Sequence, residues 1–260
     1  MPHQFIPHSH NSSRGGFSLI EMAIVLVVIG LITGGIIAGQ SIIRAAEVNS
    51  IVAEKNRYTS ATAAFKQQYG ALPGDFDEAT RYWDAAASDS TAGTGTQTRD
   101  GDGNGRIEYD SNEMFRYWEQ LQNAGLLDSA VSGIANNSSV DAFPGEHVPA
   151  TGIDGVGAYV YYVDAEAGNV APTNFYFPFE HFGHVIAFGR RDTSANALVA
   201  EFLTPNEMYK LDAKHDDGTP GYGDIMTFDD TYNADCHNDR NSYTRSFNGE
   251  ACNPIFRGVF

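Results

Sequence analysis

The sequence predicts an α+β protein in which one long N-terminal helix packs on a mostly antiparallel sheet. Three observations predict this class. Residues 22–43 carry no charged side chain, residues 44–69 place apolar side chains at helical spacing, and several later segments are rich in valine, tyrosine and phenylalanine. Because 42% of the 260 residues are hydrophobic, the chain can also form a buried core.

The charge balance limits the function classes. The chain has 33 acidic and 16 basic residues, a formal net charge of −17. Phosphate binding relies on lysine and arginine, so we expect no nucleic-acid partner. The sequence contains no G-x-S-x-G, P-loop or H-E-x-x-H motif, and we therefore expect no enzymatic activity.

The N-terminal segment predicts a single membrane span. Residues 1–16 form a polar leader and residues 17–43 are apolar, apart from Glu21. As a helix, the uncharged run 22–43 would be about 33 Å long, enough to cross a bilayer. A secretory signal peptide would place its small-residue cleavage site after the apolar stretch, whereas the pair Gly15-Gly16 precedes it.

The same helix is expected to continue as an amphipathic segment over residues 44–69. Its polar remainder includes Glu47, Glu54 and Arg57, and Gly70 and Pro73 are expected to end it. The predicted apolar stripe consists of Val48, Ile51, Val52, Tyr58, Ala61, Phe65 and Tyr69.

Residues 70–260 are expected to form one globular domain of helices and strands. Hydrophobic spacing predicts helices over 77–87 and 111–124, and a capping box at Thr204 to Glu207 predicts a further helix of about two turns. The predicted strands cover residues 156–163, 174–179, 184–189, 197–203 and 224–228.

The residues Arg14-Gly-Gly-Phe-Ser-Leu-Ile-Glu21 resemble the processing site of type IV prepilins and of type II secretion pseudopilins. The resemblance implies cleavage between Gly16 and Phe17 by prepilin peptidase, followed by N-methylation of Phe17. It also implies that Glu21 pairs with the N-terminal amine of a neighbouring subunit during assembly. Many pilins have a proline partway along this helix, whereas this chain has three glycines, Gly34, Gly35 and Gly39.

The resemblance, which is strong over residues 14–69, implies a structural subunit of a type IV pilus or pseudopilus. Such a subunit begins as a single-pass precursor in the bacterial inner membrane and ends in a periplasmic pseudopilus or an extracellular pilus. Its implied partners are identical or homologous pilin subunits. The alternative is a minor pilin or adhesin whose large C-terminal domain binds a surface or a secreted substrate.

An acidic loop in the domain is similar to the first half of a calcium-binding loop. Asp100, Asp102 and Asn104 stand at positions one, three and five, Gly105 follows at six, and Arg106 would offer its backbone carbonyl. Position twelve is Ser111 instead of a glutamate, so Asp110 and Glu113 are the expected substitutes. The alternative is a turn with solvated charges and no ion.

A second acidic loop contains Asp212, Asp216 and Asp217. It is a possible second cation site, although its residues follow no fixed ligand pattern. This loop and the Leu-Thr-Pro segment before it are similar, more loosely, to the C-terminal segments of larger pilin-like proteins.

The two cysteines, Cys236 and Cys252, are expected to form a disulfide. The prepilin orientation implied by the resemblance would place the domain in an oxidising periplasm. Two free thiols, or two ligands of a soft metal, are the alternatives.

Overall fold

The computed structural model describes residues 16–93, 95–109, 111–136, 140–163, 183–228 and 235–260. The chain divides into two compact units, Met1–Ala45 and Ala46–Phe260, and helix α1 (Leu19–Tyr69) runs through the division. The predicted long helix and the α+β class are both confirmed.

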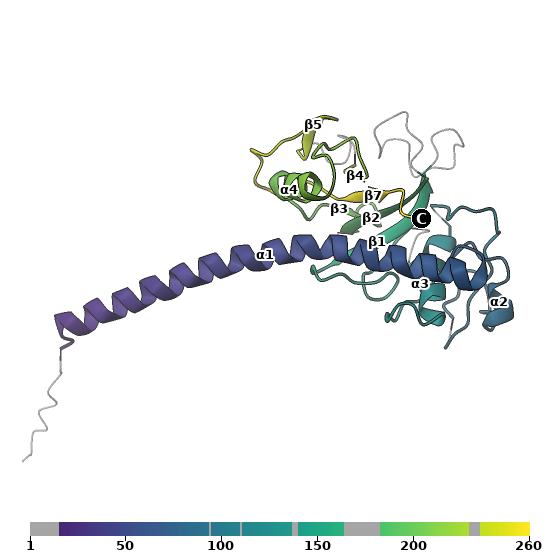
Figure 1. Ribbon diagram of the computed structural model, residues 1–260. Helices are drawn as coiled ribbons and strands as arrows, with labels where there is room; N and C mark the ends of the chain where they lie inside the picture. The colour runs from purple at the N-terminus through teal and green to yellow at the C-terminus, as the bar shows by residue number, and fades with distance from the viewer. Residues whose placement is uncertain (1–15, 94, 110, 137–139, 164–182, 229–234) are drawn as a thin grey trace, which may run out of the picture. The chain divides into compact units, whose positions relative to one another are not determined.

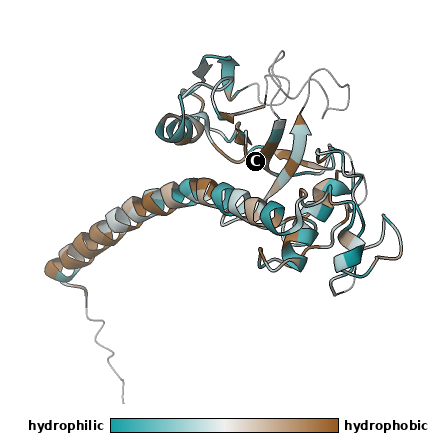
Figure 2. Ribbon diagram, turned by 45° about the vertical axis from the view of Figure 1, so that its right-hand side comes forward, coloured by the Kyte–Doolittle hydropathy of each residue, from teal (hydrophilic) through white to brown (hydrophobic). Residues whose placement is uncertain are grey.

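In the first unit, α1 presents apolar side chains that the chain itself does not cover. Leu19, Leu31 and Ile37 are each at least 69% exposed. Figure 2 colours this part of α1 as hydrophobic over most of its length. By length and composition this helix can cross a membrane.

In the second unit, the later turns of α1 belong to the hydrophobic core. Val48, Ile51 and Phe65 are buried as the stripe predicts, and the Tyr58 ring lies 4.8 Å from that of Trp118 and 6.4 Å from that of Phe188. The helix ends where Gly70 adopts a positive φ of 76° and its N–H donates to Lys66 O.

The central sheet is antiparallel throughout its described pairings (Figure 1). Strand β2 (Gly183–Asp192) pairs on one side with β1 (Val156–Val163) and on the other with β3 (Ala197–Ala200) and β7 (Ile255–Arg257). Strand β4 (Ile225–Met226) completes the order β1-β2-β7-β4. The predicted strand 174–179 lies outside the described residues.

Helices α2 and α3 come between α1 and the first strand of the sheet. Helix α3 (Glu113–Asn123) confirms the prediction for 111–124, and both faces of its middle turns are buried. Helix α2 (Ala79–Tyr82) is shorter than the predicted 77–87. The prediction was wrong at its C-terminal end because Trp83 is extended and Ala85 forms a bridge with Thr98.

Helix α4 (Pro205–His215) begins at the predicted capping box, in which Thr204 Oγ1 accepts from the Glu207 N–H at 3.3 Å. It runs a turn further than predicted, because Leu211 and Asp212 are buried at its end. Two short strands that sequence patterns did not predict, β5 (His237–Asp239) and β6 (Ser242–Tyr243), form a hairpin beside it.

Candidate functional site

The N-terminal motif lies at the start of α1. Phe17 precedes the helix and is 79% exposed, and Glu21 stands in the first turn. The Ser18 N–H donates to Glu21 Oε2 at 2.8 Å, and the Glu21 N–H donates to Ser18 Oγ at 3.2 Å. This reciprocal pair is a capping box, and it holds a carboxylate within one turn of Phe17.

In the second unit, three carboxylates from different parts of the chain converge. Oxygen atoms of Asp75, Asp102 and Glu113, here called the Asp75 cluster, all lie within 4.8 Å of one another. Asp75 follows α1, Asp102 belongs to the predicted calcium loop, and Glu113 is the first residue of α3.

Close backbone packing brings these segments together. A Cβ added at Gly101 would lie 2.4 Å from Gly74 O, and one added at Gly74 would lie 2.4 Å from Glu113 O. Glycines at both positions therefore let the three segments touch. The Asp75 carboxylate then accepts N–H groups from Asn104 and Gly105, each at 2.9 Å, which fixes the loop around it.

The cluster holds Asp75 and Glu113 in an environment that disfavours their charge. Burial raises the pKa of Asp75 to about 6, although the N–H groups of Gly105 and Asn104 act in the opposite direction. Burial and the neighbouring Glu108 carboxylate raise the pKa of Glu113 to about 9. A bound cation would offset the repulsion between these groups and favour their ionised forms.

Of the other predicted ligands, Asn104 contacts the cluster, whereas Asp100 and Arg106 make contacts elsewhere. Both Asp100 oxygens accept from Thr80, one from its N–H at 2.7 Å and one from its hydroxyl at 3.0 Å, so Asp100 caps α2. The Asn104 side-chain N–H₂ donates to Asp102 Oδ2 at 2.9 Å, and the Arg106 guanidinium lies 4.7 Å from the Tyr162 ring centre. Asp110 lies outside the described residues.

Asp75 is the residue that sequence reasoning missed. Its only signal is an acidic, glycine-containing turn, Pro73-Gly-Asp-Phe-Asp77, directly after the long helix. Nothing local in the sequence links that turn to a loop more than 20 residues further on. The turn and the loop are brought together by the close backbone packing at Gly74 and Gly101.

The donor set fits a hard divalent cation. All three side chains offer oxygen, which calcium prefers over nitrogen or sulfur. A pocket of about 390 Å³ lies beside Asp75 and is lined also by Lys66, Asp77 and Gly105, whereas Asp102 and Glu113 do not line it.

The second acidic group, Asp212, Asp216 and Asp217, also brings its oxygen atoms within 4.8 Å of one another. Here too, each carboxylate accepts hydrogen bonds from the chain. Asp212 accepts from Tyr243 OH at 2.7 Å and from the Gly218 N–H at 3.0 Å, Asp216 accepts from the Ile225 N–H at 2.8 Å, and Asp217 accepts from Thr219. Burial raises the pKa of Asp212 to about 7.

A family model described as the prokaryotic N-terminal methylation motif matches residues 11–37. This motif is the signature of type IV pilins and pseudopilins. It indicates a pilin-like or pseudopilin precursor that prepilin peptidase processes and that assembles with other pilin subunits. Comparison with curated proteins and with solved structures gave no match.

Proposed function

We propose that this chain is a structural subunit of a type IV pilus or a type II secretion pseudopilus. The match of residues 11–37 to the methylation motif supports this proposal most directly. The apolar side chains of α1 agree with it, since they need either lipid or other subunits to cover them. On this proposal the protein has a structural and not an enzymatic role.

Glu21 is the proposed assembly residue. Cleavage after Gly16 would create an ammonium group on Phe17, and the Ser18–Glu21 capping box keeps a carboxylate one helical turn away. An ammonium buried among apolar helices needs a partner of opposite charge. The Glu21 carboxylate of a neighbouring subunit would provide it.

Mass spectrometry of the mature N-terminus tests this proposal. The chain should begin at Phe17 and carry one added methyl group when it is extracted from membranes or from sheared filaments. Gly16→Val should leave the leader in place, because a branched side chain at the cleavage position obstructs the peptidase. A mature wild-type chain that retains residues 1–16 would contradict the proposal.

A minor pilin or adhesin is the second candidate. The unit that follows the membrane segment, Ala46–Phe260, is large for a protein that only fills a filament. Quantitative mass spectrometry of sheared filaments separates the two roles. A major subunit should account for most of the filament mass, whereas a minor one should be present in a few copies.

We further propose that the Asp75 cluster binds calcium. The convergence of three oxygen donors and the raised pKa values of Asp75 and Glu113 support it. Asp75, Asp102 and Glu113 would hold the ion, which would neutralise their charges and fix the loop between α2 and α3. The Asp212 group is the second candidate, and its carboxylates, like those of the Asp75 cluster, already accept hydrogen bonds from the chain.

A further inference from the structure

In the second unit, the solvent-facing side of α1 is uncharged along a row of seven residues. This row is here called the neutral face, and all of its members are exposed: Ala46, Asn49, Ala53, Asn56, Ser60, Ala63 and Gln67. Their spacing alternates between three and four residues, which places them in one line along the helix. The exposed charged residues of this segment, Arg57 and Lys66, flank the row.

The neutral face points away from the domain that α1 packs against. The buried residues of the same segment lie on the opposite side of the helix: Val48, Ile51, Tyr58, Ala61, Thr62 and Phe65. One edge of the face also contacts α4, since Lys214 Nζ donates to Asn49 Oδ1 at 2.8 Å. A helix that packs on its own domain through one side normally carries charged residues on the other, and here the charges are kept off the central row.

Uncharged, mostly short side chains at this spacing fit the close approach of a second helix. In coiled coils, residues at this spacing contact the partner helix and charged residues flank them, as Arg57 and Lys66 do here. Alanine and serine let two helix backbones come close, and asparagine can hydrogen-bond across the contact. Asn49 and Asn56, seven residues apart, would favour one register, because each amide needs a partner in it.

We propose that the neutral face contacts α1 of a neighbouring copy of this chain, outside the membrane. The proposal rests on the proposed function, since the N-terminal motif indicates assembly with other pilin subunits. The neutral face begins three residues after the uncharged run 22–43, on the same helix. A second copy whose apolar segment packs beside that run therefore brings its own α1 next to the neutral face.

The contact acts between anchored chains. A row of alanine, serine and amide side chains buries little apolar surface, so its affinity between free domains would be low. Two chains held in one membrane meet at a high effective concentration, and a weak contact between them is then populated. The apolar segment would supply the attraction, and the neutral face would select the register of the two helices.

An introduced charge tests the contact in the full chain. Ala53→Glu and Ser60→Glu should each lower the mature subunit in sheared filaments, relative to membranes, by about tenfold or more, because the contact would bury an unpaired carboxylate. Gln68→Glu is the matched control, since Gln68 is exposed on the same helix but lies outside the row. It should assemble like the wild type. All three variants should keep the melting temperature of the wild type in detergent, because the changed positions are exposed.

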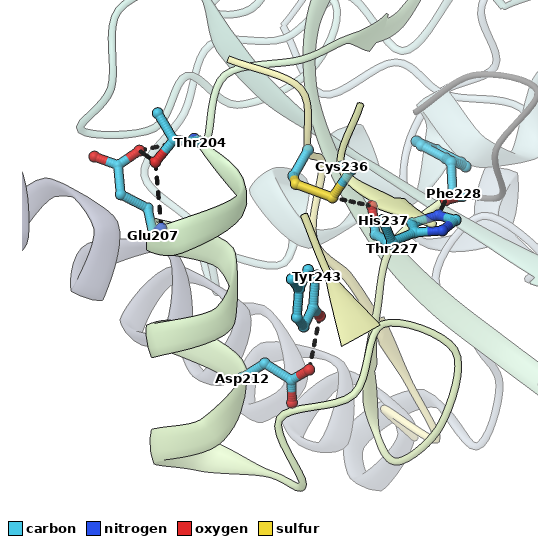
Figure 3. The surroundings of a disulfide bond; sticks show 9 residues. Thr204, Glu207, Asp212, Thr227, Phe228, Cys236, His237 and Tyr243 are labelled. Atoms are coloured by element: carbon cyan, nitrogen blue, oxygen red, sulfur yellow. Dashed lines mark hydrogen bonds between the residues drawn. A yellow bond between two sulfur atoms is a disulfide. The ribbon is translucent and has the colours of Figure 1, made fainter. Parts of the chain in front are cut away.

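A cysteine in the neutral face identifies the partner. Cys236 and Cys252 form the predicted disulfide, with Cα atoms 5.2 Å apart (Figure 3), so the chain has no free cysteine of its own. Ala53→Cys and Ala63→Cys, made singly and co-expressed, should give adducts of two subunits in sheared filaments. The reagent is a bismaleimide that spans about 10 Å, or two helical turns. Gln68→Cys should stay a single subunit.

The outcomes separate this contact from the proposed function. Normal filament yield from both glutamate variants would overturn the contact and leave the proposed function intact. Adducts with a different protein, or no adducts in filaments that form normally, would overturn it as well. Absence of the wild-type chain from sheared filaments would overturn the proposed function, and the contact with it.

Discussion

Ser18 and Glu21 exchange two hydrogen bonds at the start of α1, each from a backbone N–H to the other residue's side chain. The pair satisfies two donors that the first helical turn leaves open. It also holds the Glu21 carboxylate within one helical turn of Phe17. On the proposed function, this carboxylate caps the helix of its own chain and would also pair with the N-terminal amine of a neighbouring subunit.

Glu21→Ala should still insert into the membrane but assemble poorly. Insertion should be no worse, because a polar group is removed from an apolar segment. Assembly should suffer, because a neighbouring N-terminal ammonium loses its partner and is buried uncompensated. The measurement is the amount of mature subunit in sheared filaments relative to the amount in membranes.

Ser18→Ala is the matched control for this experiment. It removes one capping acceptor, at a cost of about 1 kcal/mol to the helix start, but keeps the Glu21 charge. Filament yield should therefore fall much less than in Glu21→Ala. Equal yields from the wild type and Glu21→Ala would contradict the assembly role.

Millimolar calcium should raise the melting temperature of the full chain in detergent, and a chelator should reverse the gain. An ion that binds only the folded state stabilises it by about 2.7 kcal/mol at a hundredfold excess over its Kd. Magnesium should do less, since it holds its own waters tightly. Thermal unfolding in each ion gives the comparison.

Two substitutions locate the calcium ligands. Asp102→Asn should remove most of the calcium gain, because Asp102 belongs to the Asp75 cluster. Asp100→Asn should lower the melting temperature through its contact with Thr80 but keep the gain. If calcium still raises the melting temperature of Asp102→Asn, the Asp212 group becomes the calcium site to test.

Without calcium, the contribution of Glu113 and Asp75 to stability should fall as the pH rises from about 5 to about 9. The pKa of Glu113 in the folded chain is about 9, against an ordinary value of 4.5, so the folded state binds more protons than the unfolded state between these values. The stabilisation is fully present below pH 4.5 and is lost as the pH approaches 9. Asp75, with a pKa of about 6, adds to the loss at the acidic end.

Melting temperatures measured in chelator across this pH range check the prediction. Glu113→Gln should flatten the slope, because an amide does not ionise. Added calcium should flatten it as well. A melting temperature that rises with pH in chelator would show that these carboxylates are ionised in the folded chain.

The buried ion pair of Arg116 and Glu119 offers a stability test apart from the proposed sites. Arg116 Nη1 lies 2.9 and 2.8 Å from the two Glu119 oxygens, and Thr98 Oγ1 donates to Glu119 at 2.7 Å. Glu119→Leu alone should cost about 3–5 kcal/mol, since it leaves a buried guanidinium unpaired. Arg116→Met combined with Glu119→Leu should cost less than the sum of the two single changes in urea unfolding.

Long periodic elements could be predicted from the sequence, whereas of the short strands β3 and β4 were predicted and β5, β6 and β7 were not. The run Val156–Val163 has the bounds that its composition predicted, and the stripe after residue 44 identified the buried face of α1. Strand β7 has three residues and no alternation to detect. It is a strand because β2 and β4 flank it, which is a property of the folded chain.

The Asp75 cluster was likewise predicted only in part from the sequence. Loop spacing selected Asp102 and Glu113, which lie in the Asp75 cluster, but it also selected Asp100, which caps α2 instead. Asp75 joins them through contacts at Gly74 and Gly101. The sequence spacing of residues within one loop can indicate which of them are ligands. It cannot identify a ligand, such as Asp75, that comes from a turn elsewhere in the sequence.

The position of β7 near the end of the chain has a consequence for the time at which the central sheet is completed. Val185, Ile186 and Ala187 of β2 pair with residues 255–257, which follow about 70 residues later, so this pairing is late in a chain that emerges from its N-terminal end. Until then residues 185–187 of β2 have an open edge on the side that β7 later covers, and another chain can pair with it. Many copies anchored in one membrane would meet at high local concentration during that interval. The pairing of residues 255–257 with β2 therefore covers part of an edge at which neighbouring copies could otherwise join their sheets.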